Sequence, residues 1–251
     1  VRRATGNNFA YLGFNLEDPA TAQLDVRLAV AHALDREAII KYVLDESARL
    51  AGALLPPEHW AGHPDLKGVS YDPPRARELL AAAGYGPERP LQLTYKTSND
   101  AVRIRLATVI QDQLARAGIQ IKLQTYDWGT FYGDIKAGRF QLYSLSWVGV
   151  KTPDIFRYVF HSGSLPPDGA NRGRFRDATA DTLIEAAEQV QDSADQVILY
   201  HALQEQLLAL LPLVPLWYED HVYAARAGIE DYALTADGNY DGLLTVKRHV
   251  H

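Results

Sequence analysis

The chain has 251 residues, enough to bury roughly 70 to 75% of its unfolded surface as one or two domains, so a stable core needs no covalent cross-links. It contains no cysteine, which excludes disulfides and thiolate chemistry. The 25 Lys and Arg residues against 31 Asp and Glu residues leave a net charge of -6, mixed along the chain, which argues against a surface that follows nucleic-acid phosphates.

Two short helices are predicted near the start of the chain. Apolar residues recur at helical spacing over residues 26–33, and Asp35 is placed to cap a second helix that carries Ile39, Ile40 and Val43. Proline and glycine then crowd residues 55–68, which indicates a surface loop.

The stretch YDPPRARELLAAAGY, residues 71–85, carries the signals of a complete helix. Asp72 is placed to cap it, Pro73 occupies the first helical position where no donor is lost, and Gly84 supplies a left-handed stop. The apolar residues at three- and four-residue spacing are Ala76, Leu79, Leu80 and Ala83. One stripe of this helix is therefore expected to be buried, and the helix is expected to be scaffold and not site.

A strand–helix–strand unit follows. Apolar and polar residues alternate over 91–95 and again over 119–123, and between them an amphipathic helix over 102–117 stops at Gly118. Strands joined in this way are parallel, and the connection between them is right-handed. A further amphipathic helix is predicted from Trp128 to Ile135, before a strand over 140–147.

The remaining elements complete an alternating pattern. A helix is predicted over 183–190, Ser193 with Gln196 predicts a capping box for the next helix, and a short strand is predicted over 213–218. This alternation predicts an α/β lobe with a mostly parallel central sheet flanked by helices. The longest apolar run, 207–218, contains two prolines and falls short of the ~20 residues that a membrane helix needs.

Six blocks in a fixed order carry a family resemblance. They are NFAYLGFNLEDP (8–19), DVRLAVAHALDREAIIKYVL (25–44), LLPPEHW (54–60), the capped helix (71–85), FQLYSLSWVGVKTPDIFRYVFHS (140–162) and GANRGRFRDATADTLIEAA (169–187). This succession resembles the solute-binding proteins of family 5, the extracytoplasmic receptors for oligopeptides, dipeptides and nickel that feed ABC importers. The resemblance covers nearly the whole chain and implies a type II periplasmic binding protein-like lobe.

The resemblance also implies how the chain is organised. Members of this family fold as two lobes around a cleft, so residues 1–216 are expected to form the second, C-terminal ligand-binding lobe. Residues 217–251 are expected to be a return segment that pairs with the missing N-terminal lobe. The chain begins at Val1 and has no methionine, so we expect it to be a processed chain or a fragment.

The implied function is the substrate-binding component of an ABC importer for peptides or peptide-like solutes. Its expected partners are a small peptide or peptide-like ligand, the missing N-terminal lobe and an ABC permease in the membrane, with no nucleic acid. The expected location is periplasmic or otherwise extracytoplasmic, with membrane anchoring through the missing N-terminus left open. The alternative is a ligand-sensing or regulatory module that uses the same lobe.

The first candidate site follows the strand over 140–147, because ligands of open α/β sheets bind beyond the carboxyl ends of the strands. In the peptide-binding relatives a tryptophan that matches Trp147 lines the pocket, and an aspartate three residues later pairs with the peptide's amino group. Here that position is Val150, followed by Lys151, so a free-amine dipeptide is not expected to be held in this way. Lys151 suggests an anionic ligand group, or is a solvated loop lysine, and Asp154 is either a helix cap or a ligand contact.

The other candidates come from neighbouring segments. Trp128 follows another strand end, as Tyr126 does, and either lines the pocket or belongs to the core. Arg172 in GANRGRF either binds a carboxylate bidentately or is a surface arginine paired with Asp177 or Asp181. Trp60 is either part of a lid or an anchor of its loop.

The sequence lacks the common catalytic and metal-binding motifs. The chain has no G-x-S-x-G, no phosphate-binding glycine loop and no H-E-x-x-H, so we expect no enzyme and no cofactor. Two histidine pairs, His59 with His63 and His249 with His251, have metal-like spacing, but neither has a third ligand nearby, so no metal site is expected.

Overall fold

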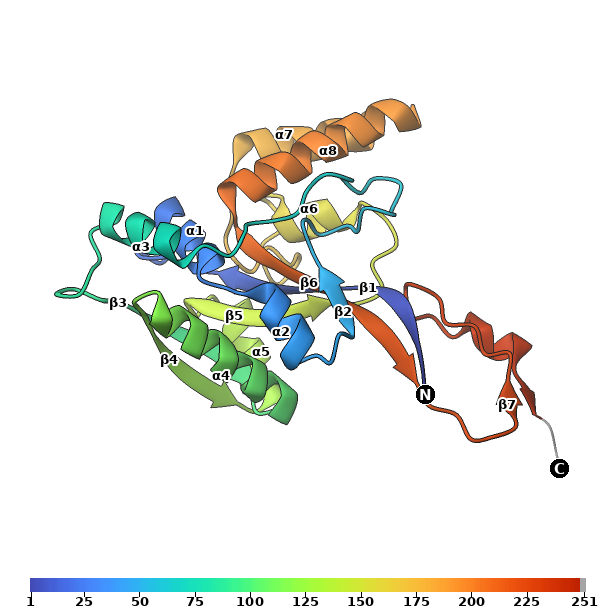
Figure 1. The fold of residues 1–251 in the computed structure, drawn as a ribbon. Helices are drawn as coiled ribbons and strands as arrows, with labels where there is room; N and C mark the ends of the chain where they lie inside the picture. The colour runs from blue at the N-terminus through green and yellow to red at the C-terminus, as the bar shows by residue number, and fades with distance from the viewer. Residues whose placement is uncertain (249–251) are drawn as a thin grey trace.

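A computed structural model of the chain describes residues 1–248. Its centre is a six-stranded sheet with the strand order β2-β6-β1-β5-β3-β4 (Figure 1). The strands are β1 (Arg2–Phe14), β2 (Ala48–Leu50), β3 (Leu91–Ser98), β4 (Ile119–Tyr126), β5 (Leu142–Trp147) and β6 (Leu213–Tyr223).

The sheet is mixed, so the prediction of a mostly parallel sheet was wrong. β3 pairs in parallel with β4 and β5, as the predicted crossover requires, but β1 pairs antiparallel with both β5 and β6, and β2 pairs antiparallel with β6. No strand was predicted before residue 91. The missed strand β1 lies in the middle of the sheet and runs opposite to its two neighbours, β5 and β6. The prediction of an α/β lobe with helices on a central sheet was correct.

Helices cover both faces of the sheet, and β1 shows why. Its successive side chains point to opposite faces, so Leu12 and Phe14 enter one core while Phe9 and Tyr11 enter the other. The first core packs against α1 (Leu24–His32), α2 (Arg36–Tyr42), α3 (Pro73–Ala82) and α4 (Ala101–Arg116). The second packs against α5 (Trp128–Lys136), α6 (Ile155–Phe160), α7 (Ala178–Gln189) and α8 (Ser193–Leu210).

Most of the helix ends predicted from capping residues are confirmed by the structure. The Asp72 side chain accepts a hydrogen bond from the Arg75 backbone N–H at 2.9 Å, and Gly84 has a φ of +84°, as predicted for α3. The prediction that Ser193 forms a capping box at the start of α8 was wrong. Asp192 caps α8 instead, and Gln196 donates to the carbonyl oxygens of Ala187 and Val190.

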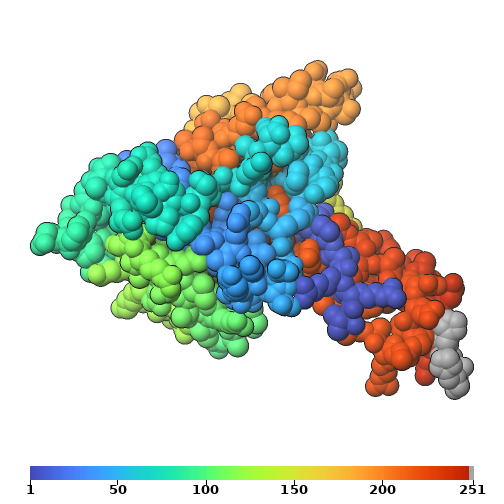
Figure 2. Space-filling model, in the orientation of Figure 1, coloured from blue at the N-terminus to red at the C-terminus, as the bar shows by residue number. Residues whose placement is uncertain are grey.

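The C-terminal part of the chain extends from the lobe. The predicted boundary at residue 216 falls within β6, where Trp217 and Tyr218 are buried in the sheet. After β6, the segment with β7 (Ile229–Glu230), a 3-10 helix (Asp241–Thr245) and β8 (Lys247–Arg248) projects beside the N-terminus (Figure 2). No helix in residues 1–248 has the length and apolar character to cross a membrane.

The carboxyl ends of four strands lie at one edge of the sheet. The parallel and antiparallel pairings make β3, β4, β5 and β6 run in one direction, so their carboxyl ends share an edge with the first residues of β1. Trp147, at the end of β5, lies opposite Phe9 of β1, which in turn lies opposite Tyr218 of β6. The loops that leave this edge are the place to build a site.

Candidate functional site

The loop after β5, residues 148–154, is held in place by two other segments. Gly149 turns the chain with a φ of +67°, and its backbone N–H donates to the Asn8 side chain at 3.3 Å. His59, in the proline-rich loop, donates to the Lys151 carbonyl oxygen at 3.0 Å. This loop, with Trp147 and Tyr158, lines an open depression of about 450 Å³.

Arg172 lies beside Trp147, on the same side of the sheet as α5 and α6. Its guanidinium carbon is 4.6 Å from the centroid of the Trp147 ring, and its nitrogens donate to the hydroxyl groups of Tyr11 at 3.0 Å and Tyr132 at 3.1 Å. Only 9% of Arg172 is exposed. It is therefore not the surface arginine of the alternative interpretation.

Trp128 belongs to the same group of side chains. Its ring stacks on Tyr132, with the centroids 5.4 Å apart and the planes 7° apart, and 53% of the residue is exposed. This exposure excludes the interpretation of Trp128 as a core residue. We call Trp128, Tyr132, Trp147 and Arg172 the aromatic cluster; it unites three residues that the sequence suggested separately.

Lys151 and Asp154 lie at the rim of the depression. The Lys151 ammonium group is 2.7 Å from a carboxylate oxygen of Asp237, in the segment after β6, so Lys151 has a partner within the chain. Asp154 precedes α6 but makes no side-chain cap, and its carboxylate accepts a hydrogen bond from Thr152 at 3.2 Å. Val150 packs against the second core.

The ion pair between Lys151 and Asp237 gives a prediction for acid titration. The hydrogen bond from Lys151 holds the pKa of Asp237 well below its ordinary value of 3.8. Because the folded-state pKa is lowered, the stabilising contribution is present above pH 3.8 and is lost as the pH falls below it. We expect Lys151→Met to raise the pKa of Asp237, as followed by the carbon-13 shift of its carboxyl group. The control is Lys122→Met, which replaces an exposed lysine of β4. An unchanged titration of Asp237 in Lys151→Met would contradict the prediction.

Several contributors to this site were missed from the sequence. Tyr11 lies in β1, which was not assigned as a strand, although Phe9 and Tyr11 have the two-residue spacing of one strand face. Tyr158 lies in α6, and its ring meets Trp147 edge-on at 6.1 Å. No local signal marks Asp237, because its partner is distant in the sequence.

The other candidates have structural roles. Trp60 packs edge-on against Tyr200 at 5.9 Å while 49% of it stays exposed. His63 lies against Glu205 at 3.0 Å, and the residues described contain no group of three that could bind a metal. His249 and His251 lie outside the described residues.

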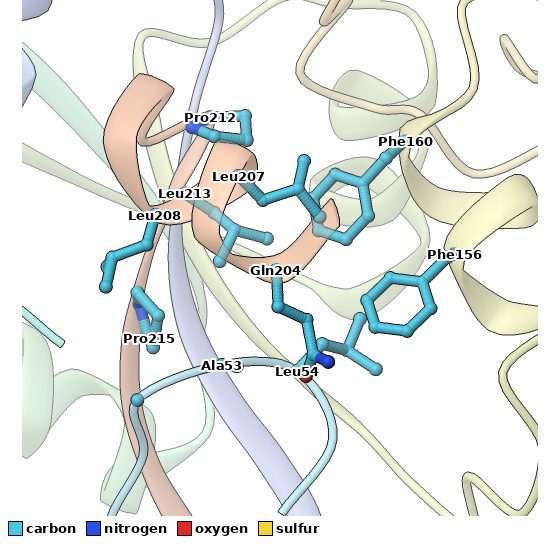
Figure 3. Close-up of a pocket in the computed structure, with 11 residues that line it drawn as sticks. Ala53, Leu54, Phe156, Phe160, Gln204, Leu207, Leu208, Pro212, Leu213 and Pro215 are labelled. Carbon is cyan, nitrogen blue, oxygen red and sulfur yellow. The ribbon is translucent and has the colours of Figure 1, made fainter. Parts of the chain in front are cut away.

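A separate small cavity lies between α6, α8 and β6 (Figure 3). Its volume is about 20 Å³, and Phe156 and Phe160 face Leu207 and Gln204 across it. The amide nitrogen of Gln204 is already bonded to the carbonyl oxygens of Ala61 and Tyr200. A cavity of this size holds about one water molecule, so it is a packing defect and not a ligand site.

The fold and this strand-end edge define the class of protein, which is a lobe of the type II periplasmic binding protein-like fold. Residues 1–165 match the family model of the bacterial extracellular solute-binding proteins, family 5 Middle. The chain belongs to this family.

Curated relatives and solved structures agree with the match. The chain is 29% identical over 241 residues to di/tripeptide-binding protein 1 of Pseudomonas aeruginosa. The aligned region covers 93% of this chain and 44% of the relative. The dipeptide-binding protein of Escherichia coli is 28% identical, with 94% and 45% covered. A dipeptide binding protein from Pseudoalteromonas, solved with Met-Leu, superposes with a TM-score of 0.85 at 27% identity, covering 99% of this chain and 50% of that one. The chain thus spans about half the length of these relatives.

Proposed function

We propose that the chain is the C-terminal lobe of a receptor that captures peptides or peptide-like solutes outside the cytoplasm for an ABC importer. The observation that carries this proposal is the strand-end edge, where Trp147 belongs both to the aromatic cluster and to the lining of an open depression. The names of the relatives, which are di- and tripeptide-binding proteins, support the ligand class.

The missing N-terminal lobe would supply the opposite wall of the site. A ligand that touches both lobes stabilises the closed state, because the open state offers only half of the contacts. The closed form would then dock on a membrane permease. An extended peptide suits such a cleft, since its main chain offers hydrogen bonds while hydrated pockets accept different side chains.

The first test is calorimetry of this chain alone with a dipeptide such as Met-Leu. We expect the chain to bind it more weakly than about 1 μM, because half of the contacts and the closure step are absent. The two-lobed protein, titrated in parallel, should bind a peptide ligand more tightly. Submicromolar binding by this chain would show a self-sufficient site, and a two-lobed protein that binds no peptide from a mixed library would refute the peptide class.

A further inference from the structure

Arg172 is a buried cation without an acidic partner in residues 1–248. Its two hydrogen bonds go to the hydroxyl groups of Tyr11 and Tyr132. The two acids suggested as its partners bond to other groups. The Asp177 carboxylate accepts a hydrogen bond from the backbone N–H of Ala180, and the Asp181 carboxylate accepts one from the backbone N–H of Ser162. Burying a charge without an opposite charge costs several kcal/mol, so an unpaired guanidinium requires an explanation.

The tyrosines around Arg172 do not neutralise it. Burial raises the pKa of Tyr11 above its ordinary value of 10.0, and burial raises that of Tyr143 further. Both phenols are therefore uncharged at neutral pH. The positive charge of Arg172 is solvated by hydroxyl groups and aromatic rings but is not offset by an anion.

A second donor in the same place also lacks an acceptor. The indole nitrogen of Trp147 is buried and has no hydrogen-bond partner among the described residues. An indole N–H can only donate, and a buried donor left unpaired is destabilising. This nitrogen belongs to the ring whose centroid lies 4.6 Å from the guanidinium carbon of Arg172, so the unpaired donor and the unpaired cation are direct neighbours.

Lys151 is the other cation near the depression, and it is already paired. Its ammonium group lies 2.7 Å from the carboxylate of Asp237, which is itself 16% exposed and also bonded to the Asn239 side chain. An incoming anion at Lys151 would have to compete with this carboxylate. Arg172 has no such competitor within the described part of the chain.

We propose that Arg172 and the indole nitrogen of Trp147 together bind a carboxylate of the ligand, with Trp128 and Tyr132 forming the exposed rim. The inference rests on the proposed function and specifies the ligand's chemistry: an anionic end or side chain, not an ammonium group, meets this side of the cleft. Guanidinium and indole donors both suit a carboxylate, because charge-assisted hydrogen bonds are roughly twice as strong as neutral ones.

The test uses nuclear magnetic resonance of the indole N–H groups of this chain, which contains 4 tryptophans. Trp147→Phe assigns the Trp147 signal. We expect acetate to shift that signal in a saturable way at millimolar concentration, and acetamide, which is neutral and of similar shape, not to shift it. Arg172→Gln should weaken the acetate response about tenfold, while Arg172→Lys, which keeps the charge, should weaken it less. Lys122→Gln is the matched control on a remote strand.

Two further probes distinguish the source of the carboxylate. N-acetyl-alanine carries only a terminal carboxylate, and N-acetyl-aspartic acid α-amide, with both termini blocked, carries only a side-chain one. The probe that binds with the lower half-saturation concentration identifies the source.

Three results would overturn the inference: no response to acetate, an equal response to acetamide, or loss of the response in Lys151→Gln but not in Arg172→Gln. The acetate and acetamide comparison needs no variant, so a misfolded Arg172→Gln leaves it intact. These outcomes are separate from the fate of the proposed function, which depends on peptide binding by the two-lobed protein.

Discussion

Replacing Arg36 with alanine is expected to lower the free energy of unfolding by about 3 kcal/mol or more. The guanidinium of Arg36 donates to the carbonyl oxygens of Ala51 and Pro215, each at 2.8 Å, and to those of Lys67 and Val69. Only 5% of Arg36 is exposed, and its bonds to Ala51 and Pro215 are buried, so truncation leaves these two carbonyls without this donor in the interior. One side chain thereby joins α2, the proline-rich loop and β6.

Urea denaturation measures this loss, with the slope checked for two-state behaviour. Arg36→Lys should recover little of the lost stability. The planar guanidinium reaches the carbonyls of three segments at once, and a single ammonium group cannot. Arg75→Ala is the matched control: within residues 1–248 the side chain of this exposed arginine pairs with Glu78 of its own helix, and its loss should change stability by no more than about 0.5 kcal/mol. A loss below about 1 kcal/mol in Arg36→Ala would show that water replaces the guanidinium.

In the two-lobed protein, Trp147→Ala is expected to weaken ligand binding about 30-fold, or about 2 kcal/mol. The Trp147 ring lines the depression and contacts both the guanidinium of Arg172 and the ring of Tyr158. Its removal takes away an aromatic surface and exposes Arg172 to water. Calorimetric titration with a peptide that the unmodified protein binds measures the change.

A second Trp147 variant and a control variant complete this experiment. Trp147→Phe keeps an aromatic ring but removes the indole donor, so it separates ring contact from hydrogen bonding. Tyr42→Ala removes an aromatic residue that is 71% exposed at the end of α2, a helix that packs on the opposite face of the sheet from Trp147, and should leave binding unchanged. Equal affinity of Trp147→Ala and the unmodified protein would place the ligand elsewhere.

The pairing of Lys151 changes how the loop after β5 should be interpreted. From the sequence alone, a lysine beside Val150 suggests an anion-binding site. The structure brings Asp237 against it from the segment after β6, and the backbone of that segment is also held by Asn7, which donates to the Ala236 carbonyl oxygen at 2.8 Å. The segment that leaves the lobe thus also shapes the rim of the site.

Features that depend on near neighbours could be predicted from the residues alone. The cap at Asp72, the left-handed stop at Gly84 and the parallel pair of β3 and β4 were all predicted, because a helix end or a crossover is decided within a few residues or one short unit. The ordered motifs likewise indicated the family. Ser193 failed as a cap because the Asp192 carboxylate, one position earlier, takes the free N–H groups.

The strand directions in the sheet and the charge pairing at the candidate site depend on contacts between distant segments. β1 has the same alternation whether it pairs parallel or antiparallel, so its place between β5 and β6 cannot be read from its residues. Arg172 meets a tyrosine hydroxyl 161 positions away, and Lys151 meets a carboxylate beyond β6. Charge pairing and burial depend on which segments the fold brings together, and that information is not local.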